Sequence, residues 1–290
     1  MQANSRARCN LCSRSEKLIM NSGRLKLERN LTPDQFLLWW FDHAEAHGLA
    51  TEYRTIFYSR YFDAQDRIGY VWEHFARRMD YFSRMDLEGK QFLDVGCGPG
   101  TEVLWAALRG ANTTGIELHQ LSLQTARKRL EILKRHFPVS VTLLDRNLLE
   151  LEGQFDFILL RETFHHLEPR ERVVEKLAQL LSDDGVLVIE ETNGLNPIIQ
   201  LKYLLIRGRN TITTKRRDDG VTYLFGNERI TTARNLDGMF SKVGIAGRAE
   251  HFRLLPTALA RIAPIARACW HFERMFKDLL MLRPFYLHYS

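Results

Sequence analysis

The sequence predicts an α/β fold in which a mostly parallel sheet carries helices on both faces. Residues 90–192 alternate short apolar or β-branched runs with helix-compatible runs, a pattern typical of parallel strands joined by crossover helices. A turn with three glycines follows the first predicted strand, and charged residues close several of the strands. Because ligands of such sheets bind at the carboxyl ends of the strands, this edge is the predicted functional site.

The first predicted strand covers Gln91–Val95 and leads through Gly96, Gly98 and Gly100 into a helix over Thr101–Leu108. Glycine lets backbone pass close to a ligand, because it has no Cβ. The turn lacks the Gly-Lys-Ser/Thr of a P-loop, and Thr101 stands where a dinucleotide fingerprint needs glycine. Asp94 favours a ligand with a positive end, since a carboxylate repels a pyrophosphate.

Three more strands are predicted to end on a charged residue: 112–116 before Glu117, 139–144 before Asp145, and 154–160 before Arg161. A fifth motif, Leu180–Glu190, reads as a helix end, a turn and a strand. The carboxylate of Glu117 can accept hydrogen bonds from two ribose hydroxyls. Because the strands are predicted to be parallel, Asp94, Glu117, Asp145 and Arg161 are expected to converge on one edge.

These five ordered motifs resemble class I S-adenosylmethionine-dependent methyltransferases over residues 90 to about 250. The resemblance implies a Rossmann-like, seven-stranded, mostly parallel sheet and S-adenosyl-L-methionine as the cofactor. It implies contacts with the ribose and adenine from the residues that follow the second and third strands, and further contacts from the glycine turn. The cofactor-binding residues implied in this way are Asp94, Gly96, Cys97, Gly98, Gly100, Glu117, Leu118, Asp145, Arg146, Asn147 and Arg161.

His165 and His166 are the candidate catalytic residues, because the loop after the fourth strand is where the methyl group meets the substrate in this family. An imidazole can accept a proton near neutral pH. Adjacent residues point in different directions, so one of the two is expected to face the ligand. For either residue, packing or capping is the favoured role and proton acceptance is the alternative. Glu162 either binds substrate or pairs with Arg161.

The same loop argues against several chemistries. It lacks the acidic ligands of the metal-dependent catechol branch, so the transfer is predicted to be metal-independent. Residues 161–164 read Arg-Glu-Thr-Phe, without the Asn/Asp-Pro-Pro-Tyr/Phe or Pro-Cys motifs of enzymes that methylate nucleic-acid bases. Nucleic acid is therefore not the expected substrate.

The regions around the core are predicted from composition and helical spacing. A loosely ordered leader is expected over 1–30, an aromatic-rich N-terminal helical lid over 31–88, and the core over 89–255 with a basic insertion at 195–226. Thr32 and Pro33 mark a helix start, with apolar spacing that continues to Leu49. Residues 244–250 and 251–255 are expected to be the closing antiparallel strands. An amphipathic helical extension is expected over 256–290, with its inward face formed by Leu259, Ile262, Ile265, Ala266, Trp270, Phe272, Phe276, Leu279 and Leu280.

Composition places the chain among soluble globular proteins. It has 290 residues, 45% of them hydrophobic and 26% charged, and a net charge of +6, a mild bias compatible with anionic partners. No uncharged run reaches the length of a membrane span, and no signal peptide or disulfide framework is evident, so a cytoplasmic location is predicted. Cys9-x-x-Cys12 lies 30 residues from His43-x-x-x-His47, a spacing that favours free thiols over a zinc site.

The predicted function is methyl transfer to an oxygen, nitrogen or carbon of a small-molecule or lipid-like acceptor, since the motifs are similar to ubiquinone/menaquinone-type methyltransferases. The basic insertion and the amphipathic tail either contact an anionic membrane surface or form packing and homodimer surfaces. A non-catalytic cofactor-binding partner or regulator is one alternative, and RNA or protein methylation is another. The intact Asp94, Gly96, Gly98 and Glu117 argue against the non-catalytic alternative.

Overall fold

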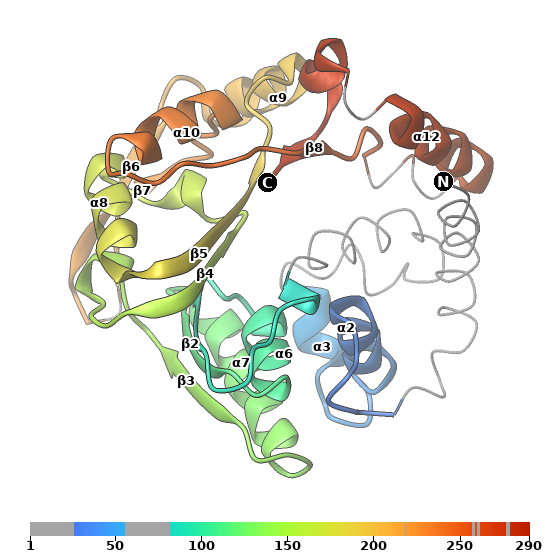
Figure 1. The fold of residues 1–290 in the computed structure, drawn as a ribbon, viewed down its shortest axis with the longest axis vertical. Helices are drawn as coiled ribbons and strands as arrows, with labels where there is room; N and C mark the ends of the chain where they lie inside the picture. Colours follow the sequence, from blue (N-terminus) through green and yellow to red (C-terminus); the bar gives the residue numbers. More distant parts are fainter. Residues whose placement is uncertain (1–25, 56–81, 218, 257–258, 260–261, 277–278) are drawn as a thin grey trace. The chain divides into compact units, whose positions relative to one another are not determined.

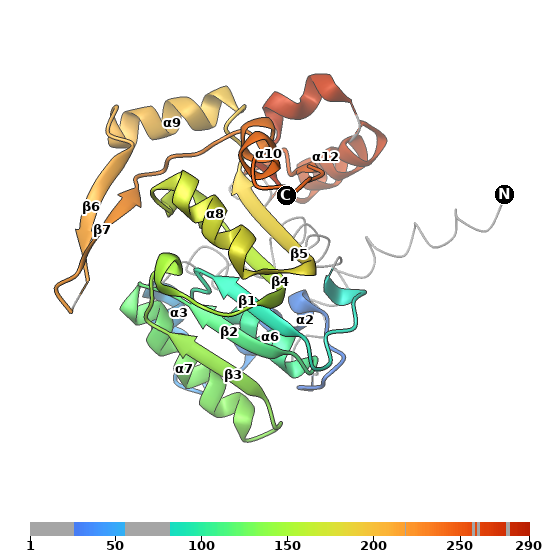
Figure 2. The ribbon, with the colours of Figure 1, turned by 60° about the vertical axis from the view of Figure 1, so that its left-hand side comes forward.

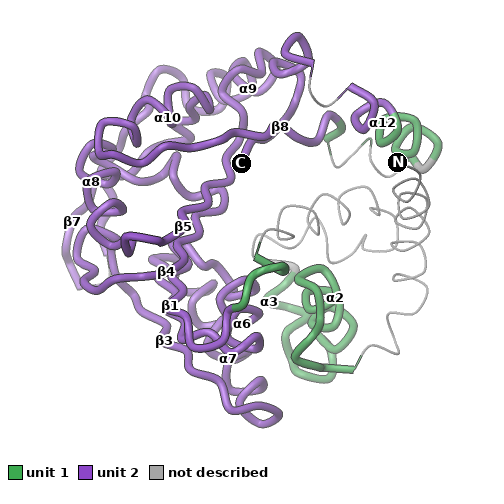
Figure 3. Tube along the Cα trace, viewed as in Figure 1, with its two compact units in different colours: residues 1–86, 255–271 green, residues 87–254, 272–290 purple. Residues whose placement is uncertain are grey.

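The computed structural model contains two compact units (Figure 3), of which one comprises residues 1–86 with 255–271 and the other residues 87–254 with 272–290. The structure describes residues 26–55, 82–217, 219–256, 259, 262–276 and 279–290. The predictions for residues 1–25 and 56–81, including those for Cys9 and Cys12, lie outside the described residues.

The second unit is built on a mixed sheet (Figure 1), in which seven strands within the described residues follow the order β3-β2-β1-β4-β5-β9-β8. All pairs among β1 to β5 are parallel, whereas β9 runs antiparallel to both β5 and β8. The predicted fold class is therefore confirmed. The strands are β1 (Gln91–Val95), β2 (Asn112–Ile116), β3 (Ser140–Leu144), β4 (Phe155–Arg161), β5 (Leu181–Thr192), β8 (His251–Phe252) and β9 (His288–Tyr289).

Helices cover both faces of this sheet (Figure 2), with α6 and α7 on one face and α8 and α10 on the other. Apolar residues of β1 and β4 pack with Val173, Leu177 and Phe240 in one buried cluster. This packing fixes the carboxyl ends of β1 and β4, where the predicted site lies. The helical segments are α6 (Thr101–Leu108), α7 (Gln120–Lys134), η3 (Leu148–Glu150), η4 (Phe164–His166), α8 (Arg170–Leu180), α10 (Ala233–Ser241) and η5 (Leu280–Phe285).

The turn predicted between residues 180 and 185 is instead part of β5, which begins directly after α8. Phe155 pairs with Leu181, whereas Phe157 pairs with Val186, so the register between β4 and β5 shifts at this point. Two steps along β4 correspond to five along β5, and the extra residues form a bulge. This bulge keeps the second half of β5 in register with β4 up to the pair Arg161 and Glu190.

The closing strands differ from the prediction. Residues 244–250 form no strand, so that assignment is wrong, and β8 is only two residues long. The other antiparallel strand is β9, within the segment predicted as a helical extension. Tyr289 pairs with Glu191 of β5 and with His251 of β8, and its side chain is buried. A two-residue strand has no periodicity of its own, which explains why the sequence pattern did not reveal it.

The basic insertion contains α9 (Pro197–Arg207), where the apolar run from Ile198 to Ile206 predicts a short helix, and a hairpin of β6 (Ile212–Arg216) and β7 (Thr222–Gly226) that was not predicted. Asn196 caps α9 by accepting hydrogen bonds from the backbone N–H groups of Ile198 and Ile199. None of the α9 residues, all of which the structure describes, is buried. This helix therefore presents a large apolar surface: Ile198, Leu201, Leu204, Leu205 and Ile206 are all exposed.

In the first unit, α2 (Pro33–Asp42) begins as predicted, because Gln35 Oε1 accepts a hydrogen bond of 2.9 Å from the backbone N–H of Thr32. The helix ends at Asp42, with His43 as its C-cap, and not near Leu49. The chain then turns through Gly48, which has a positive φ of 66°. It is followed by α3 (Ala50–Thr55). The rings of Trp39 and Trp40 pack edge to face at 5.0 Å, which supports a core role for these aromatics.

Helix α12 (Ala263–Phe276) belongs partly to each unit. Ala266 and Trp270 are buried as predicted, but Ile262, Ile265 and Phe272 are 45%, 42% and 41% exposed. The predicted inward face is thus wrong for much of its length, and Leu259, Leu279 and Leu280 are exposed too. The structure buries a narrower line of residues that includes Glu273, whose Oε1 accepts a hydrogen bond from the Leu254 N–H. None of the helices in the described ranges combines the length and apolar character that crossing a bilayer requires.

Candidate functional site

The glycine turn after β1 has one closed and one open side. Gly96, Gly98 and Gly100 all have positive φ, at 71°, 52° and 80°. A Cβ on Gly96 would collide with the side chain of Thr163, whereas a Cβ on Gly98 would meet no atom within 4 Å. The backbone at Gly98 is therefore accessible to a ligand, as a cofactor-binding turn requires.

Asp94 lies buried beneath this turn. Its Oδ2 has no hydrogen-bond partner among the described residues. Burial, together with the negative charge of Glu102, raises the pKa of Asp94 well above its ordinary range, and the guanidinium of Arg161 acts in the opposite direction. Arg161 forms an ion pair with Glu102. The structure thus joins Asp94 to Arg161 through Glu102, a residue that the sequence analysis did not single out.

Glu117 connects the end of β2 to the glycine turn. Its Oε2 accepts a hydrogen bond of 2.9 Å from the Gly98 N–H, and its Oε1 accepts one of 2.7 Å from the His119 N–H. Leu118 follows, half-buried. Both carboxylate oxygens of Glu117 therefore lie at the carboxyl edge of the sheet, next to the open side of the turn.

The end of β3 forms the next part of this edge. Asp145 Oδ2 accepts a hydrogen bond of 2.6 Å from Gln120 Nε2. Asn147 Oδ1 accepts one of 3.0 Å from the Leu149 N–H, so this side chain caps η3, while Arg146 is exposed. From the hairpin, Arg217 donates a hydrogen bond of 3.4 Å to the Asp145 carbonyl and contacts Glu150 at 3.1 Å. The β6–β7 hairpin therefore reaches the predicted adenine end of the site.

Cys97 contributes packing to the turn. Its side chain is buried against Gly115 of β2, where a Cβ would come within 2.9 Å of the Cys97 Sγ. Burial raises the pKa of this thiol, so it stays protonated. This placement leaves the backbone of Cys97, and not its sulfur, as the part that shapes the turn.

His165 is held by Glu191, near the end of β5. Its Nδ1 lies 2.6 Å from Glu191 Oε2, and Glu191 Oε1 also accepts a hydrogen bond of 3.0 Å from the Thr163 N–H. Burial alone would lower the pKa of His165, but the charge and hydrogen bond of Glu191 outweigh it and raise the pKa to about 9. His165 is therefore an imidazolium at neutral pH, which makes it a poor proton acceptor.

His166 has the opposite character. Its Nδ1 lies 2.8 Å from the carbonyl of Gly226, so the proton belongs on Nδ1 and Nε2 carries a lone pair. The ring stacks on Phe225 at 4.4 Å. Burial and the positive charge of His165 lower the pKa of His166 to about 4. The neighbouring histidines are thus differentiated, and only His166 is neutral at pH 7.

Glu162 follows β4 directly and pairs with residues of the neighbouring strands, not with Arg161. Its Oε1 lies 2.7 Å from His288 Nδ1 of β9, and its Oε2 accepts a hydrogen bond of 2.7 Å from Thr192 Oγ1. Burial would raise the pKa of Glu162, but the charge of His288 and these hydrogen bonds lower it to about 2. The carboxylate therefore links the end of β4 to β5 and β9.

Comparison with known proteins shows what this chain is similar to. Residues 93–187 match the family described as a methyltransferase domain. The ubiquinone biosynthesis O-methyltransferase of Chromobacterium violaceum is 34% identical over 111 residues, 37% of this chain and 47% of that protein. Its counterpart in Alkalilimnicola ehrlichii is 31% identical over 160 residues, 51% of this chain and 62% of that protein. The chain therefore spans about half to three-fifths of the length of these relatives.

A solved structure shares the fold. Phosphoethanolamine N-methyltransferase 2 of Haemonchus contortus superposes with a TM-score of 0.52 at 16% identity, over 88% of this chain and 58% of that one. Residues 93–187 are therefore similar to a methyltransferase domain, and the fold around them is one that a methyltransferase uses.

The carboxyl edge of this methyltransferase domain suits S-adenosylmethionine, which carries an ammonium and a sulfonium but no phosphate. The buried Oδ2 of Asp94 lacks a partner among the described residues, so it can accept a hydrogen bond from an ammonium group. The open side of Gly98 leaves room for a ligand beside the turn. The hydrogen-bond acceptor on Asp94 and the space beside Gly98 therefore both fit S-adenosylmethionine.

Besides Glu102, two further acidic residues were missed as site residues. Glu191 follows Glu190, and both are buried because helices cover both faces of the sheet. Adjacent residues at the end of a strand point to opposite faces, so only one acid of the pair can reach the histidine loop. Glu228 follows β7, and its carboxylate lies 3.8 Å from His165 Nε2. No local signal in the sequence reveals Glu228, because only the tertiary fold brings the hairpin beside η4.

Proposed function

We propose that this protein transfers the methyl group of S-adenosylmethionine to a small-molecule acceptor with lipid-like character. The observation that carries the proposal is the meeting of two strand-end carboxylates at one glycine turn. Asp94 lies beneath the turn with an oxygen that has no partner in the described part of the chain, and Glu117 accepts a hydrogen bond from the Gly98 N–H at the open side of the turn. Such a site matches the ammonium and ribose of the cofactor, while the matched methyltransferase domain gives the reaction.

We assign the residues of this edge to different parts of the cofactor. Asp94 would hold the ammonium group, with Arg161 and Glu102 fixing its surroundings. Glu117 and Leu118 would contact the ribose, and Asp145, Arg146 and the backbone at Asn147 the adenine. Gly96, Cys97, Gly98 and Gly100 would let the backbone approach the cofactor. Alignment of the acceptor with the methyl group then supplies much of the acceleration.

His166 is the proposed catalytic residue on the acceptor side. Its Nε2 carries the lone pair that can accept the acceptor's proton, whether that proton comes from oxygen or nitrogen. His165 is the positioning partner, because Glu191 holds it as an imidazolium next to the His166 ring. The cofactor supplies a methyl group on a positively charged sulfur, a good leaving group, so this transfer step needs no metal.

The lipid-like character of the acceptor is proposed from the insertion. Helix α9 exposes Ile198, Leu201, Leu204 and Leu205, and basic residues lie at its end and along the hairpin. A helix with exposed apolar residues and neighbouring cations can lie on an anionic membrane surface, where lipid-like acceptors are found. The matched relatives, named as ubiquinone biosynthesis O-methyltransferases, point to the same class of acceptor.

Methyl transfer from radiolabelled S-adenosylmethionine into a fractionated extract of the source cells tests this proposal. We expect label in the organic phase, and we expect the Glu117→Ala protein to lose that label at limiting cofactor. Label confined to RNA and removed by nuclease, or label in protein, would contradict the proposed acceptor. Cofactor binding without any transfer would favour the non-catalytic partner or regulator.

A vesicle experiment tests the proposed peripheral membrane contact. We expect the protein to float with vesicles containing anionic lipid at low salt and to dissociate at high salt. The double variant Leu201→Glu with Leu205→Glu should stay in solution. Met275→Glu, a change at an exposed apolar residue of α12, should float like the wild type. Equal flotation of both variants would contradict the contact, and a change from dimer to monomer in the α9 variant would show that a second copy covers this face.

A further inference from the structure

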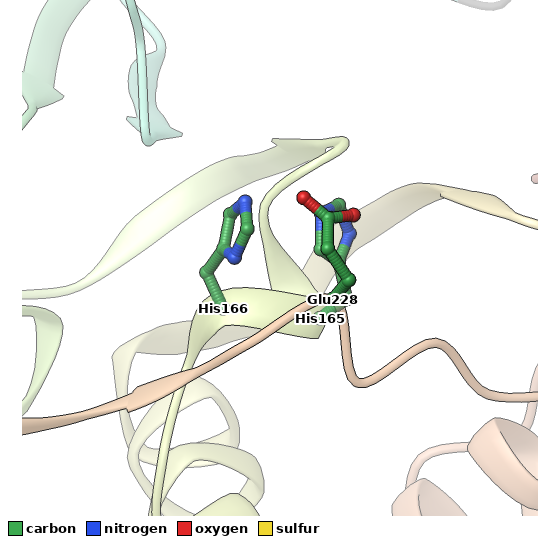
Figure 4. A group of neighbouring side chains, drawn as sticks. All are labelled: His165, His166 and Glu228. Carbon is green, nitrogen blue, oxygen red and sulfur yellow. The ribbon is translucent and has the colours of Figure 1, made fainter. Parts of the chain in front are cut away.

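A cluster of metal-ligating side chains lies beside the cofactor edge. His165 and His166 come from η4, and Glu228 from the segment that follows β7. One ligand atom from each of the three lies within 4.8 Å of the other two. In Figure 4 both imidazoles and the carboxylate point to the same side of the backbone that carries them. Two imidazoles and one carboxylate are a donor set that divalent transition metals use.

The hydrogen bonds of both imidazoles engage Nδ1 and leave Nε2 toward the cluster, and at His165 a metal ion would displace the Nε2 proton of the imidazolium. Nδ1 of His165 lies 2.6 Å from Glu191 Oε2, and Nδ1 of His166 lies 2.8 Å from the Gly226 carbonyl. Histidines that bind a metal usually donate their second ring N–H to a carboxylate or a backbone carbonyl, as both do here. The two Nε2 atoms are therefore oriented as ligands before any ion arrives.

The charges around the cluster favour a cation. Glu191 and Glu228 flank His165, and Glu162 also contributes negative charge there. Lys215 lies over the Phe225 ring, His288 pairs with Glu162, and Arg170 interacts with Glu191. The carboxylates that contact the His165 imidazole, Glu191 and Glu228, are therefore the groups that favour a cation there.

The backbone and a neighbouring hydroxyl also hold Glu228 in place. Glu228 adopts a φ of +50°, a conformation that costs energy for a residue with a side chain. The hydroxyl of Tyr203, on α9, forms a hydrogen bond with the Glu228 carboxylate. The strained position and the hydrogen bond together direct this carboxylate to the histidine pair.

We propose that His165 Nε2, His166 Nε2 and Glu228 bind one divalent transition-metal ion, with Zn²⁺ as the representative. A zinc ion holds such ligands at about 2.0–2.2 Å, and therefore roughly 3.3–3.5 Å from one another in tetrahedral geometry. The 3.8 Å between His165 Nε2 and Glu228 Oε2 is close to that spacing. Three protein ligands leave a fourth position open, as in catalytic zinc sites.

The proposed metal site does not depend on the proposed function, but the effect of a bound ion on methyl transfer does. An ion at this position occupies the His166 lone pair assigned above to the acceptor's proton. In the metal-loaded protein the acceptor oxygen would bind at the open position of the ion instead. Metal binding is therefore measured directly, without methyl transfer, so that failure of one proposal leaves the other standing.

The test uses the full-length protein after treatment with a chelator, titrated with Co²⁺ and then with Zn²⁺ against a chromophoric chelator. The background is the double variant Cys9→Ser with Cys12→Ser, which removes the thiols of the leader. We expect one ion per chain, visible Co²⁺ bands of low-coordinate geometry, and no sulfur-to-cobalt charge-transfer band. The proposal would be overturned if the variant binds no ion. It would also be overturned if one ion per chain binds only to protein that keeps both Cys9 and Cys12.

Variants then locate the ion. In this background Glu228→Gln, His165→Ala and His166→Ala should each weaken Zn²⁺ binding by more than about 100-fold. Glu191→Gln changes only the hydrogen bond that orients the His165 ring, so it should weaken binding by roughly 10–100-fold. His136→Ala removes an exposed histidine and should bind like the parent. Glu228→Gln keeps the shape of the side chain, so its circular dichroism should match the parent. Unchanged affinity in a folded Glu228→Gln protein would contradict this ligand set.

Discussion

At the scale of single residues, Glu117 gives the sharpest prediction about cofactor binding. Replacing it by alanine leaves the ribose hydroxyls without an acceptor, so Glu117→Ala should weaken S-adenosylmethionine binding by about 1–3 kcal/mol. Isothermal titration calorimetry measures this directly. Glu152→Ala, a change of an exposed acid on the same unit, is the matched control and should bind normally. An unchanged dissociation constant in Glu117→Ala would refute the ribose assignment.

The two histidines should respond differently to substitution in metal-free protein. His166→Ala removes the free Nε2, so we expect kcat to fall by roughly 10²–10⁴-fold while the dissociation constant of the cofactor stays the same. His165→Ala should act mainly through stability, because it removes the buried partner of Glu191. Thermal unfolding and turnover at saturating acceptor distinguish these effects. If turnover is normal in His166→Ala, this residue only packs against the hairpin.

The sequence could predict that the proposed cofactor residues lie together at one edge of the sheet, but not the whole acceptor side. Asp94, Glu117, Asp145 and Arg161 were found because they end consecutive predicted strands, and parallel strands bring their carboxyl ends together. The partners of the histidines come from β5 and from the segment after β7. Contacts such as those of Glu228 depend on the path of the hairpin, which the local pattern does not contain.

At the scale of the elements, Glu162 and His288 give a prediction about pH. The pKa of Glu162 is about 2 in the folded protein, below its ordinary value of 4.5. The ionised carboxylate therefore stabilises the fold fully above pH 4.5, and this contribution is lost as the pH falls toward 2. The free energy of unfolding of wild type should exceed that of Glu162→Gln near neutral pH, and the difference should shrink across this window.

Urea denaturation at a series of pH values measures that difference. Glu131→Gln changes an exposed acid of α7 and serves as the reference variant. A wild-type advantage that stays constant from pH 7 to pH 2 would mean that Glu162 stabilises β9 by shape alone.

The elements also show where pattern reasoning reaches its limit. The strands β1 to β4 were predicted to within one or two residues, because each is an apolar run bounded by turn or charged residues. The bulge in β5 was read as a turn, since its Ser-Asp-Asp-Gly sequence is typical of turns. The burial of α12 was overestimated, because helical spacing identifies an apolar face but not whether a partner covers it.

At the scale of the whole molecule, cofactor binding should stabilise the fold. A ligand that binds only the folded state contributes about 2.7 kcal/mol at a concentration 100 times its dissociation constant. We therefore expect S-adenosylmethionine to raise the melting temperature, and S-adenosylhomocysteine, which keeps the ammonium, to do so too. Adenosine lacks the group that Asp94 would hold, so it should give a smaller shift at equal concentration. Equal shifts from all three would argue against the role of Asp94.

The position of β9 has a consequence for how the protein folds during its synthesis. Tyr289 occupies a place between β5 and β8 and pairs with Glu191, a residue made 98 positions earlier (191 and 289). Until residue 289 leaves the ribosome, the edge of β5 next to the histidine loop has unpaired backbone groups that invite pairing with other chains. A nascent chain stalled in α12 should therefore associate with other chains more readily than one released with β9 in place.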